Sequence, residues 1–408
     1  MVVLFLLMAS VGGVVLDEGI GARLATERKI RGLTQQQLAA RAHVSLSLIQ
    51  AVEQGQRPAT ATLVAAAARA LRVDRSLLTG QPYRDPGAAD EAMHAGVTDL
   101  RREVAAHGLE PLEDRAAANL RERTGSASRL RQASRYGALG EVLPDLIADL
   151  RWASFTTDGE EHQRVAAMLA EAYDAGRQLA WKLGYLDLAH ELATLYREMA
   201  RTSEDPLAIE VGEAMRAHDL IATGDYDLAH HVVTRSLDRL DQVPESHKQR
   251  SVRGYMMLEG ALVAARQGRD RERDDYHGQA ERLAERTGHD RDDYRLAFGP
   301  TNCRIWAVGL AVEALDGRQG VAKAGLVSLP VGTPAERAGH HWIDVARAYL
   351  LIGEHGSALD ALWQARQVAP EHTRSHPMAR ETVYALARKE RRATDSLRGL
   401  AVWLGIND

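Results

Sequence analysis

The chain has 408 residues, more than one small hydrophobic core can organise, so two or more domains are expected. Its single cysteine, Cys303, excludes an intramolecular disulfide framework. The formal net charge of −5 hides an asymmetry, because residues 17–84 hold ten Arg and Lys against five Asp and Glu, a net of +5, and residues 85–408 hold a net of −10. A basic module joined to an acidic body is typical of a DNA-binding unit attached to a domain that does not bind DNA.

Residues 1–16 are expected to be an apolar extension outside the folded domains. The apolar run is shorter than the roughly 18–20 residues of a membrane span, and no Lys or Arg precedes it as in a signal peptide. The favoured interpretation is a start site assigned too early, with the true start at Met8 or later. The alternative is a hydrophobic arm that packs on the protein or on a partner.

Residues 17–79 are expected to form the first domain, and its most informative stretch is residues 35–52, which predicts two short helices joined by a tight turn. Thr34 and Ser45 are the expected N-caps, because each hydroxyl can accept from a backbone N–H of the first turn. The apolar positions that should face inward are Leu38, Ala39, Ala42, Val44, Ile49 and Val52. The outer face of the second helix is then free to enter a DNA major groove.

This pattern resembles the helix-turn-helix domain of the Xre-like family, to which phage repressors and Cro belong. The resemblance spans Ile20 to Leu78, with a fourth helix starting near Thr60 and a short fifth helix after Val73-Asp74. One departure is His43, in a turn where the family usually places Gly, and a non-Gly residue with positive φ carries a steric cost there. The resemblance implies a five-helix DNA-binding domain that binds an operator, an inverted repeat, as a homodimer.

The resemblance also implies which residues meet DNA. Gln35 and the helix N-terminus at Ser45 are expected at the phosphate backbone, together with Arg57 after the motif. Ser47 and Gln50 could hydrogen-bond to base edges, whereas Leu46 and Ala51 offer only apolar contact. The full expected DNA-binding set is Thr34, Gln35, Ser45, Leu46, Ser47, Gln50, Ala51 and Arg57. For each residue the alternative is an ordinary helix cap or a solvated side chain.

Residues 80–96 are rich in Gly and Pro and are expected to be a linker. Beyond it, residues 97–408 predict an all-α body, a solenoid of helix pairs. Residues 342–370 resemble a tetratricopeptide repeat closely, and degenerate units surround Gly184, Gly224, Gly268 and Gly317. The steps between these turns are longer than the standard repeat of about 34 residues, which predicts irregular helix pairs.

Stacked helix pairs create a concave face that can bind a peptide or another ligand. Together the two parts resemble bacterial regulators whose repeat domain binds a short signalling peptide, and a group of actinobacterial regulators. Peptide-binding members use inner-helix asparagines, of which the repeats offer one. The effector groove is therefore expected to involve Arg216, Arg253, Asn302, Arg304 and Arg347, although Arg on a repeat helix is most often solvated or salt-bridged.

No motif for catalysis, a metal or a cofactor stands out, and adjacent pairs such as His340-His341 would chelate a metal poorly because they diverge on a helix. Cys303 is expected to be a small buried hydrophobe. The sequence predicts a cytoplasmic, non-enzymatic transcriptional regulator, without a cofactor, whose repeat body senses a peptide or small molecule and holds a dimer. The alternatives are a repeat-domain adaptor and an antitoxin-like repressor, each of which binds a partner protein.

Overall fold

The computed structural model describes residues 19–84, 88–115, 118–389 and 394–406. The apolar extension expected at residues 1–16 lies outside this part of the chain. The described residues form helices and contain no β-strand, only an isolated antiparallel bridge between Arg291 and Phe298. The expected all-α class is confirmed. None of the described helices combines the length and apolarity needed to cross a bilayer.

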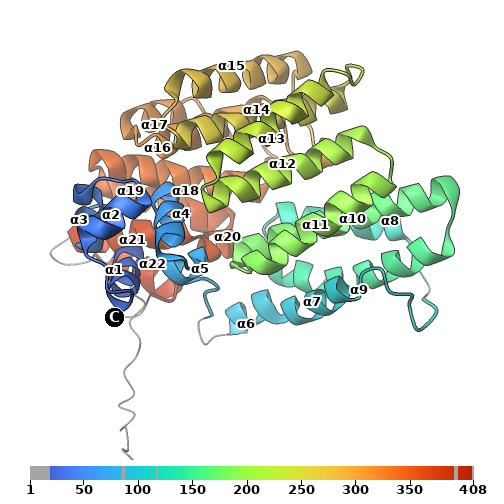
Figure 1. Cartoon of the computed structure of the whole chain (residues 1–408), viewed down its shortest axis with the longest axis horizontal. Coiled ribbons are helices and arrows are strands. Elements are labelled where there is room, and N and C mark those ends of the chain that lie inside the picture. The colour runs from blue at the N-terminus through green and yellow to red at the C-terminus, as the bar shows by residue number, and fades with distance from the viewer. Residues whose placement is uncertain (1–18, 85–87, 116–117, 390–393, 407–408) are drawn as a thin grey trace, which may run out of the picture.

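Five helices make up the N-terminal unit, defined here as residues 20–79. They are α1 (Ile20–Ile30), α2 (Gln35–Ala42), α3 (Leu46–Glu53), α4 (Ala61–Leu71) and α5 (Arg75–Thr79). The fourth and fifth helices start where expected, and side chains cap both, since Thr60 accepts from Leu63 N–H and Asp74 from Ser76 N–H. In Figure 1 these blue helices cluster at one edge of the molecule.

The body begins with four helices and continues as helix pairs joined by short turns. The first four are α6 (Ala88–Ala95), α7 (Val97–Ala105), α8 (Leu120–Gln132) and α9 (Tyr136–Thr156). The pairs are α10 (Gly159–Leu183) with α11 (Leu186–Thr202), α12 (Pro206–Thr223) with α13 (Tyr226–Leu240), α14 (His247–Arg266) with α15 (Asp270–Thr287), α16 (Pro300–Glu313) with α17 (Gly317–Ala324), and α18 (Ala335–Ile352) with α19 (His355–Val368). Figure 1 shows α10 to α15 stacked in chain order, as in a helical repeat.

Short elements complete the body: the 3₁₀ turn η1 (Asp293–Arg295), then α20 (Pro370–Ser375), α21 (Pro377–Lys389) and α22 (Asp395–Trp403). Of the glycines expected between paired helices, Gly184, Gly224 and Gly268 lie in the turns, whereas Gly317 is already the first residue of α17. Gly184 and Gly353 end α10 and α18 in the left-handed conformation, with φ of 90° and 83°. Glycine adopts this conformation without the Cβ penalty, so the chain can reverse directly into the next helix.

The stretch expected to be a linker is more structured than the sequence indicated. Residues 88–95 form α6, which packs against α9. Ahead of it, the amide of Gln81 donates to the Ser375 carbonyl at 3.0 Å and the Tyr83 hydroxyl donates to the Thr79 carbonyl at 2.9 Å. Within residues 80–96, expected to be a linker, tertiary contacts thus hold segments whose own periodicity is weak.

The hydrophobic cores do not follow the expected domain boundaries. One core fills the helices from α6 to α14. A second core runs from the N-terminal unit into the C-terminal helices, and joins Leu24, Ile49 and Leu63 to Met378 and Val383 among others. The N-terminal unit is thus packed against the C-terminal helices and shares a hydrophobic core with them.

Candidate functional site

The two-helix motif has the local structure that its residues predicted. The Thr34 hydroxyl accepts from Gln37 N–H, and the Gln37 side chain accepts in return from Thr34 N–H, which completes a capping box. Ser45 accepts from Leu48 N–H at 3.2 Å. The expected inward residues are buried, except for Val44, which is half-buried against the same core. Both N-cap predictions are confirmed.

The turn between the two helices holds His43 in the left-handed conformation, with φ 55° and ψ 41°. Its backbone N–H bonds to the carbonyls of Ala39 and Ala40 and so closes α2. The sequence predicted a positive φ at this position, where the family usually places Gly. The structure has this positive φ at His43.

A buried ion pair fixes the start of α2 against α1 and α3. Arg28 donates to both carboxylate oxygens of Glu53, at 2.6 and 2.7 Å, and the Gln35 amide adds a third bond to Glu53 at 2.8 Å. Burial alone would raise the pKa of Glu53, but the bonds from Arg28 and Gln35 hold this pKa below its usual value. Gln35, expected at a phosphate, is thus held by Glu53 and keeps one amide hydrogen for another acceptor.

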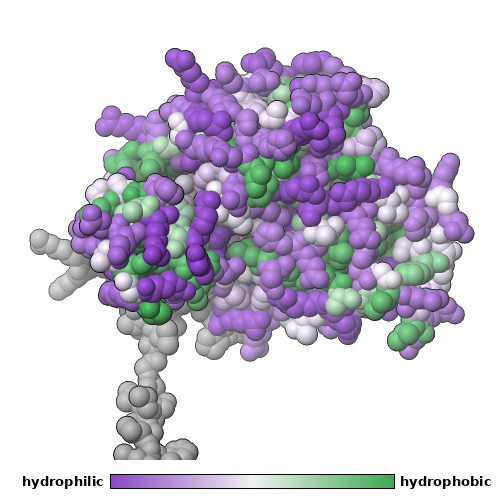
Figure 2. Space-filling view, in the orientation of Figure 1, coloured by the Kyte–Doolittle hydropathy of each residue, from purple (hydrophilic) through white to green (hydrophobic). Residues whose placement is uncertain are grey.

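The outer face of α3 is open to solvent. Leu46, Ser47 and Arg57 are exposed, and Gln50 and Ala51 are half-buried. The Ser45 hydroxyl also lies 3.1 Å from the Ser47 hydroxyl. In Figure 2 hydrophilic side chains predominate on the visible face, interrupted by small separate hydrophobic patches. The geometry leaves the helix N-terminus at residues 45–47 free to approach an anion such as a phosphate.

The N-terminal unit is docked on the body by side chains that reach its backbone. Glu381 of α21 accepts from the N–H groups of Ile20 and Ala59, at 3.3 and 3.2 Å. Arg388 of the same helix donates to the Gly55 carbonyl at 3.0 Å. On the other side, Arg69 of α4 donates to the carbonyl of Gly224 at 2.8 Å. The unit is therefore held from two directions.

A cavity of about 240 Å³ lies at the junction between the N-terminal unit and the body. Ala61, Val64, Arg75 and Thr79 line it from α4 and α5, and the rest of the wall comes mainly from α10, α12, α14, α16 and α18. Its apolar surface includes Trp181 and Trp306. The cavity is thus built jointly by both parts of the molecule.

Six cationic side chains and three carboxylates line this cavity. The cations are Arg75, Arg177, Lys182, Arg266, Arg337 and Arg347, and the carboxylates are Glu259, Glu313 and Asp344. Glu313 accepts from Arg266 at 2.9 Å and from Arg347 at 3.0 Å. Burial alone would raise the pKa of Glu313, but these two guanidinium groups lower it to about 2. The carboxylate is therefore charged at neutral pH.

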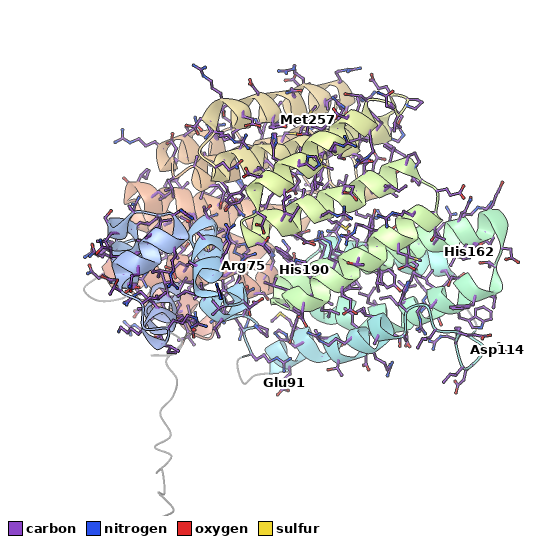
Figure 3. The ribbon with its side chains drawn as sticks, in the orientation of Figure 1. Arg75, Glu91, Asp114, His162, His190 and Met257 are labelled. Carbon is purple, nitrogen blue, oxygen red and sulfur yellow. The ribbon has the colours of Figure 1, made fainter. Side chains whose placement is uncertain are left out.

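Arg75 stands apart from the other cations. It makes no hydrogen bond or ion pair with any residue that the structure describes, and its Nε is shut off from solvent. Its guanidinium lies over the ring of Trp181, with 6.0 Å between the guanidinium carbon and the ring centroid. Desolvation, followed by the nearby charge of Arg266, lowers the pKa of Arg75 to about 10, so it remains a cation at neutral pH. Figure 3 labels Arg75 where the blue helices meet the body.

Three histidines meet in the same wall. The nitrogens of His340, His372 and His376 that could bind a metal all lie within 4.8 Å of one another. Nδ1 of His340 and Nε2 of His372 have no hydrogen-bond partner, but Nδ1 of His376 accepts from Met378 N–H at 3.2 Å. In a neutral ring the proton of His376 then sits on Nε2. Two nitrogens of the cluster thus lack a partner and the third is an N–H donor, which fits a metal ion less well than three unprotonated nitrogens would.

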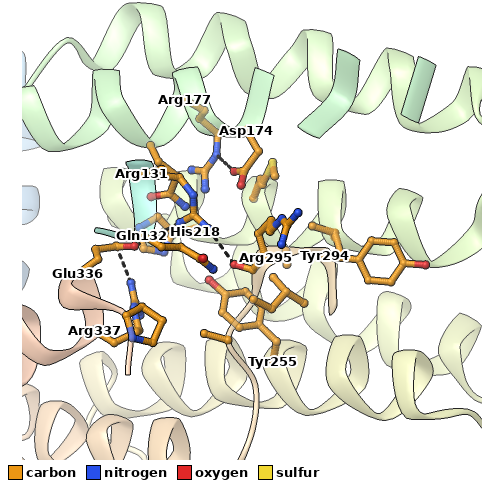
Figure 4. Close-up of a pocket in the computed structure, with 17 residues that line it drawn as sticks. Arg131, Gln132, Asp174, Arg177, His218, Tyr255, Tyr294, Arg295, Glu336 and Arg337 are labelled. Carbon is orange, nitrogen blue, oxygen red and sulfur yellow. Dashed lines mark hydrogen bonds and ion pairs between the residues drawn. The ribbon is translucent and has the colours of Figure 1, made fainter. Parts of the chain in front are cut away.

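A smaller cavity of about 40 Å³ adjoins the first and shares Arg177, His218, Tyr255 and Arg337 with it. Figure 4 shows this charged region, in which ion pairs join Arg177 to Asp174 and Arg337 to Glu336. Lys182 also bonds to Glu336, at 2.8 Å. The inner face of the body is thus charged but largely paired.

The comparisons with known proteins bear on the N-terminal unit. Residues 20–79 match a family model described as a helix-turn-helix domain. This part of the chain is a helix-turn-helix domain. No curated protein matches the chain.

Two solved structures resemble the chain weakly. BtubC (BKLC) from P. vanneervenii is 15% identical, over 63% of this chain and 92% of that chain, with a TM-score of 0.36. PlcR from Bacillus thuringiensis, solved with the peptide PapR7 and DNA, is 12% identical, over 84% of this chain and 99% of that chain, with a TM-score of 0.34. These similarities are too low to carry an argument about this chain.

The residues expected in an effector groove are scattered. Arg347 lines the cavity, but the other four do not. Arg216 pairs with Glu213 at 3.2 Å, Arg253 pairs with Asp241, and Arg304 is exposed. Asn302 is buried, and neither its side-chain oxygen nor its nitrogen has a hydrogen-bond partner among the described residues. The structure therefore does not bring the predicted set together.

Sequence reasoning missed Arg75 and the three histidines. Arg75 read as part of the helix-turn-helix domain, and His340 was weighed only against its neighbour His341. No local spacing marks either feature, because the partners come from α5, α10, α18 and α20. Cys303 is buried, as expected, and burial raises the pKa of its thiol.

Proposed function

We propose that this protein is a transcriptional regulator that reads an operator through the helix-turn-helix domain and senses an effector through its repeat-like body. The observation that best supports operator binding is the open outer face of α3. Leu46 and Ser47 are exposed on this helix, and its other face is buried in the core. The net charge of +5 over residues 17–84, against −10 over residues 85–408, supports the same orientation on DNA.

In this proposal Gln50 and Ser47 contact base edges, and Arg57 and Gln35 contact phosphates. The amide hydrogen of Gln35 that Glu53 leaves free supports a backbone contact, because the ion pair with Arg28 holds the side chain in place. Two domains joined in a homodimer would place two α3 helices on an inverted repeat, since one helix alone supplies too little affinity.

The body, residues 97–408, is proposed as the sensor and the dimerisation domain of a bacterial, cytoplasmic protein without catalytic activity. The cavity supports a bound effector, because its wall includes α4 and α5 of the helix-turn-helix domain. An adaptor that binds a partner protein would instead be expected to have an open groove in place of a cavity.

The proposal is tested by affinity selection of genomic DNA fragments on the purified full-length protein. The test variant combines Gln50→Ala with Arg57→Ala, and the matched control is Arg304→Ala, which removes an exposed arginine from the body. We expect an enriched inverted repeat for the native protein and the control. The test variant should lose about 1–3 kcal/mol at the base contact and show a salt slope reduced by about 1.

Equal enrichment by the native protein and the test variant would contradict the assignment of α3. An absence of enriched DNA together with a stoichiometric co-purified protein would favour the alternatives, an adaptor or an antitoxin-like repressor. Light scattering on the same preparation checks the dimer.

A further inference from the structure

We propose that the junction cavity binds a small organic acid, whose anionic group pairs with Arg75 and whose apolar part packs between the tryptophans of the wall. This inference rests on the proposed function, because it names the effector class of that regulator. It differs from a peptide bound along the inner face of the body, since the ligand would contact the helix-turn-helix domain directly.

Among the cations of the wall, Arg75 alone lacks an ion-pair partner in the described part of the chain. Each of the other five cations of the wall has a carboxylate within ion-pair distance: Asp174 for Arg177, Glu336 for Lys182 and Arg337, and Glu313 for Arg266 and Arg347. Arg75 has none among the described residues. Arg75 is half-buried, and a partly desolvated cation without a counter-charge is unfavourable, so a bound anion would supply the missing partner.

The charge of the wall also favours an anion, because six cationic side chains line the cavity against three carboxylates. Close to Arg75, desolvation and the charge of Arg266 lower its pKa, and Asp74, Tyr226 and Glu313 oppose this shift. His340 and His372 do not add to the charge of the wall at neutral pH. Desolvation and the charge of Lys182 lower the pKa of both well below the usual range. An anion is therefore favoured over a cation, and the guanidinium geometry favours a carboxylate, which can accept two parallel bonds.

The size and the apolar surface of the cavity favour a small aromatic ligand. The volume of about 240 Å³ exceeds the ~150 Å³ of an engineered cavity that binds benzene, and lies below the roughly 300–1,000 Å³ of pockets for drug-sized ligands. Trp181, Leu262, Ile305, Trp306 and Met378 provide the apolar wall. A ring with a short carboxylate-bearing arm fits this space, whereas a peptide of several residues does not.

Two polar groups of the wall are available to fix orientation. The indole N–H of Trp306 has no acceptor among the described residues. His376 presents an N–H donor, because its other ring nitrogen already accepts from Met378. Both can donate to the oxygen atoms of an acid, and Nδ1 of His340, Nε2 of His372 and the carboxylate of Glu259 are further wall groups without a hydrogen-bond partner among the described residues.

Occupancy would be linked to DNA binding through α5. Arg75 and Thr79 belong to this helix, while Trp181 lies on α10 and Trp306 on α16 of the body. A ligand that touches both sides favours the docked position of the helix-turn-helix domain by the difference in its affinity for the docked and undocked states.

The test uses two acid and amide pairs on the full-length protein, phenylacetate against phenylacetamide and indole-3-acetate against indole-3-acetamide. Binding is read as a shift in the unfolding temperature, and for the phenyl pair also as quenching of tryptophan fluorescence. We expect at least one acid to bind tenfold or more tightly than its amide. Arg75→Met should abolish this preference, Arg75→Lys should weaken it, and Arg304→Met should leave it unchanged.

The proposal is overturned if neither acid is preferred over its amide, or if Arg75→Met keeps the preference of the native protein. Circular dichroism verifies that each variant is folded, and Arg75→Lys serves if Arg75→Met is not. The DNA selection is run on the same preparations. Enriched DNA without acid binding would remove only this inference, whereas acid binding without enriched DNA would remove the proposed function and leave the cavity assignment standing.

Discussion

At the scale of single residues, His43 in the turn of the helix-turn-helix domain adopts a strained backbone conformation. His43 ends α2 with φ 55°, a conformation in which the Cβ of an L-residue crowds the backbone. The left-handed conformation of His43 lets the next N–H, that of Val44, turn back and bond to the Ala39 carbonyl at 3.0 Å. The strain is therefore local to one residue and separable from the outer face of α3.

We expect His43→Gly to stabilise the protein by about 0.5–1 kcal/mol, because glycine adopts this conformation without strain. The greater conformational entropy of glycine in the unfolded chain offsets part of this stabilisation. Chemical denaturation of the helix-turn-helix domain within the full chain measures the change. Arg41→Gly, two residues earlier in α2, is the matched control and should destabilise by about 1 kcal/mol. Equal destabilisation by both variants would show that the histidine is not strained.

At the scale of elements, α21 acts as the support for the helix-turn-helix domain. Glu381 is buried and accepts from two backbone N–H groups, of Ile20 at the start of α1 and Ala59 before α4. Burial raises the pKa of this carboxyl, although Arg388 and the two N–H groups oppose the rise. One side chain thus holds two elements of the domain in place.

Replacing Glu381 with Ala leaves two N–H groups without an acceptor, at a cost of about 1–3 kcal/mol for each one that stays buried. We expect faster hydrogen exchange over residues 20–79, with the exchange of α10 to α15 unchanged. Glu381→Gln keeps one acceptor and should have an intermediate effect, while Glu141→Ala on the exposed face of α9 is the control. Exchange that rises equally throughout the body would contradict a local docking role.

At the scale of the whole molecule, the second hydrophobic core and the cavity both span the boundary between the helix-turn-helix domain and the body. The histidine cluster lies in this shared wall. Desolvation is the main cause that lowers the pKa of His340, His372 and His376, with Lys182 contributing to all three. The imidazoles are therefore neutral in the folded protein at pH 7.

The folded-state pKa of these groups lies below the unfolded value of about 6.5, so the unfolded chain binds more protons as the pH falls through that value. Their contribution to stability is present above pH 6.5 and is lost on acidification. We expect the unfolding temperature to fall between pH 7.5 and 5, before the carboxylates titrate. His372→Gln should reduce this dependence, and His231→Gln, on an exposed side chain, should not. A pH profile that is identical for all three proteins would refute the prediction.

Arg75 gives a second prediction at this scale, independent of any ligand. Removal of a desolvated cation without a partner should leave the protein as stable as before or more so. We expect Arg75→Met to raise the unfolding temperature by about 1–3 °C in the absence of added acids. A decrease of several degrees would mean that Arg75 is needed for docking and is not held ready for an anion.

The sequence by itself determined what depends on neighbours along the chain. Thr34 and Ser45 cap their helices as predicted, because an N-cap reaches only two or three residues ahead. Leu38, Ile49 and Val52 face inward because the helical period fixes their side. Gly184 and Gly353 mark turns for the same local reason.

Only the tertiary structure decided how distant segments meet. It brought Glu381 under Ile20, His340 beside His372 and His376, and Arg75 opposite Trp181, and it left Arg216, Arg253, Asn302 and Arg304 outside the cavity. Periodicity gives the face of each helix but neither its neighbours nor the charges that remain unpaired. Those depend on the packing of helices far apart in the chain, which is also what creates the cavity.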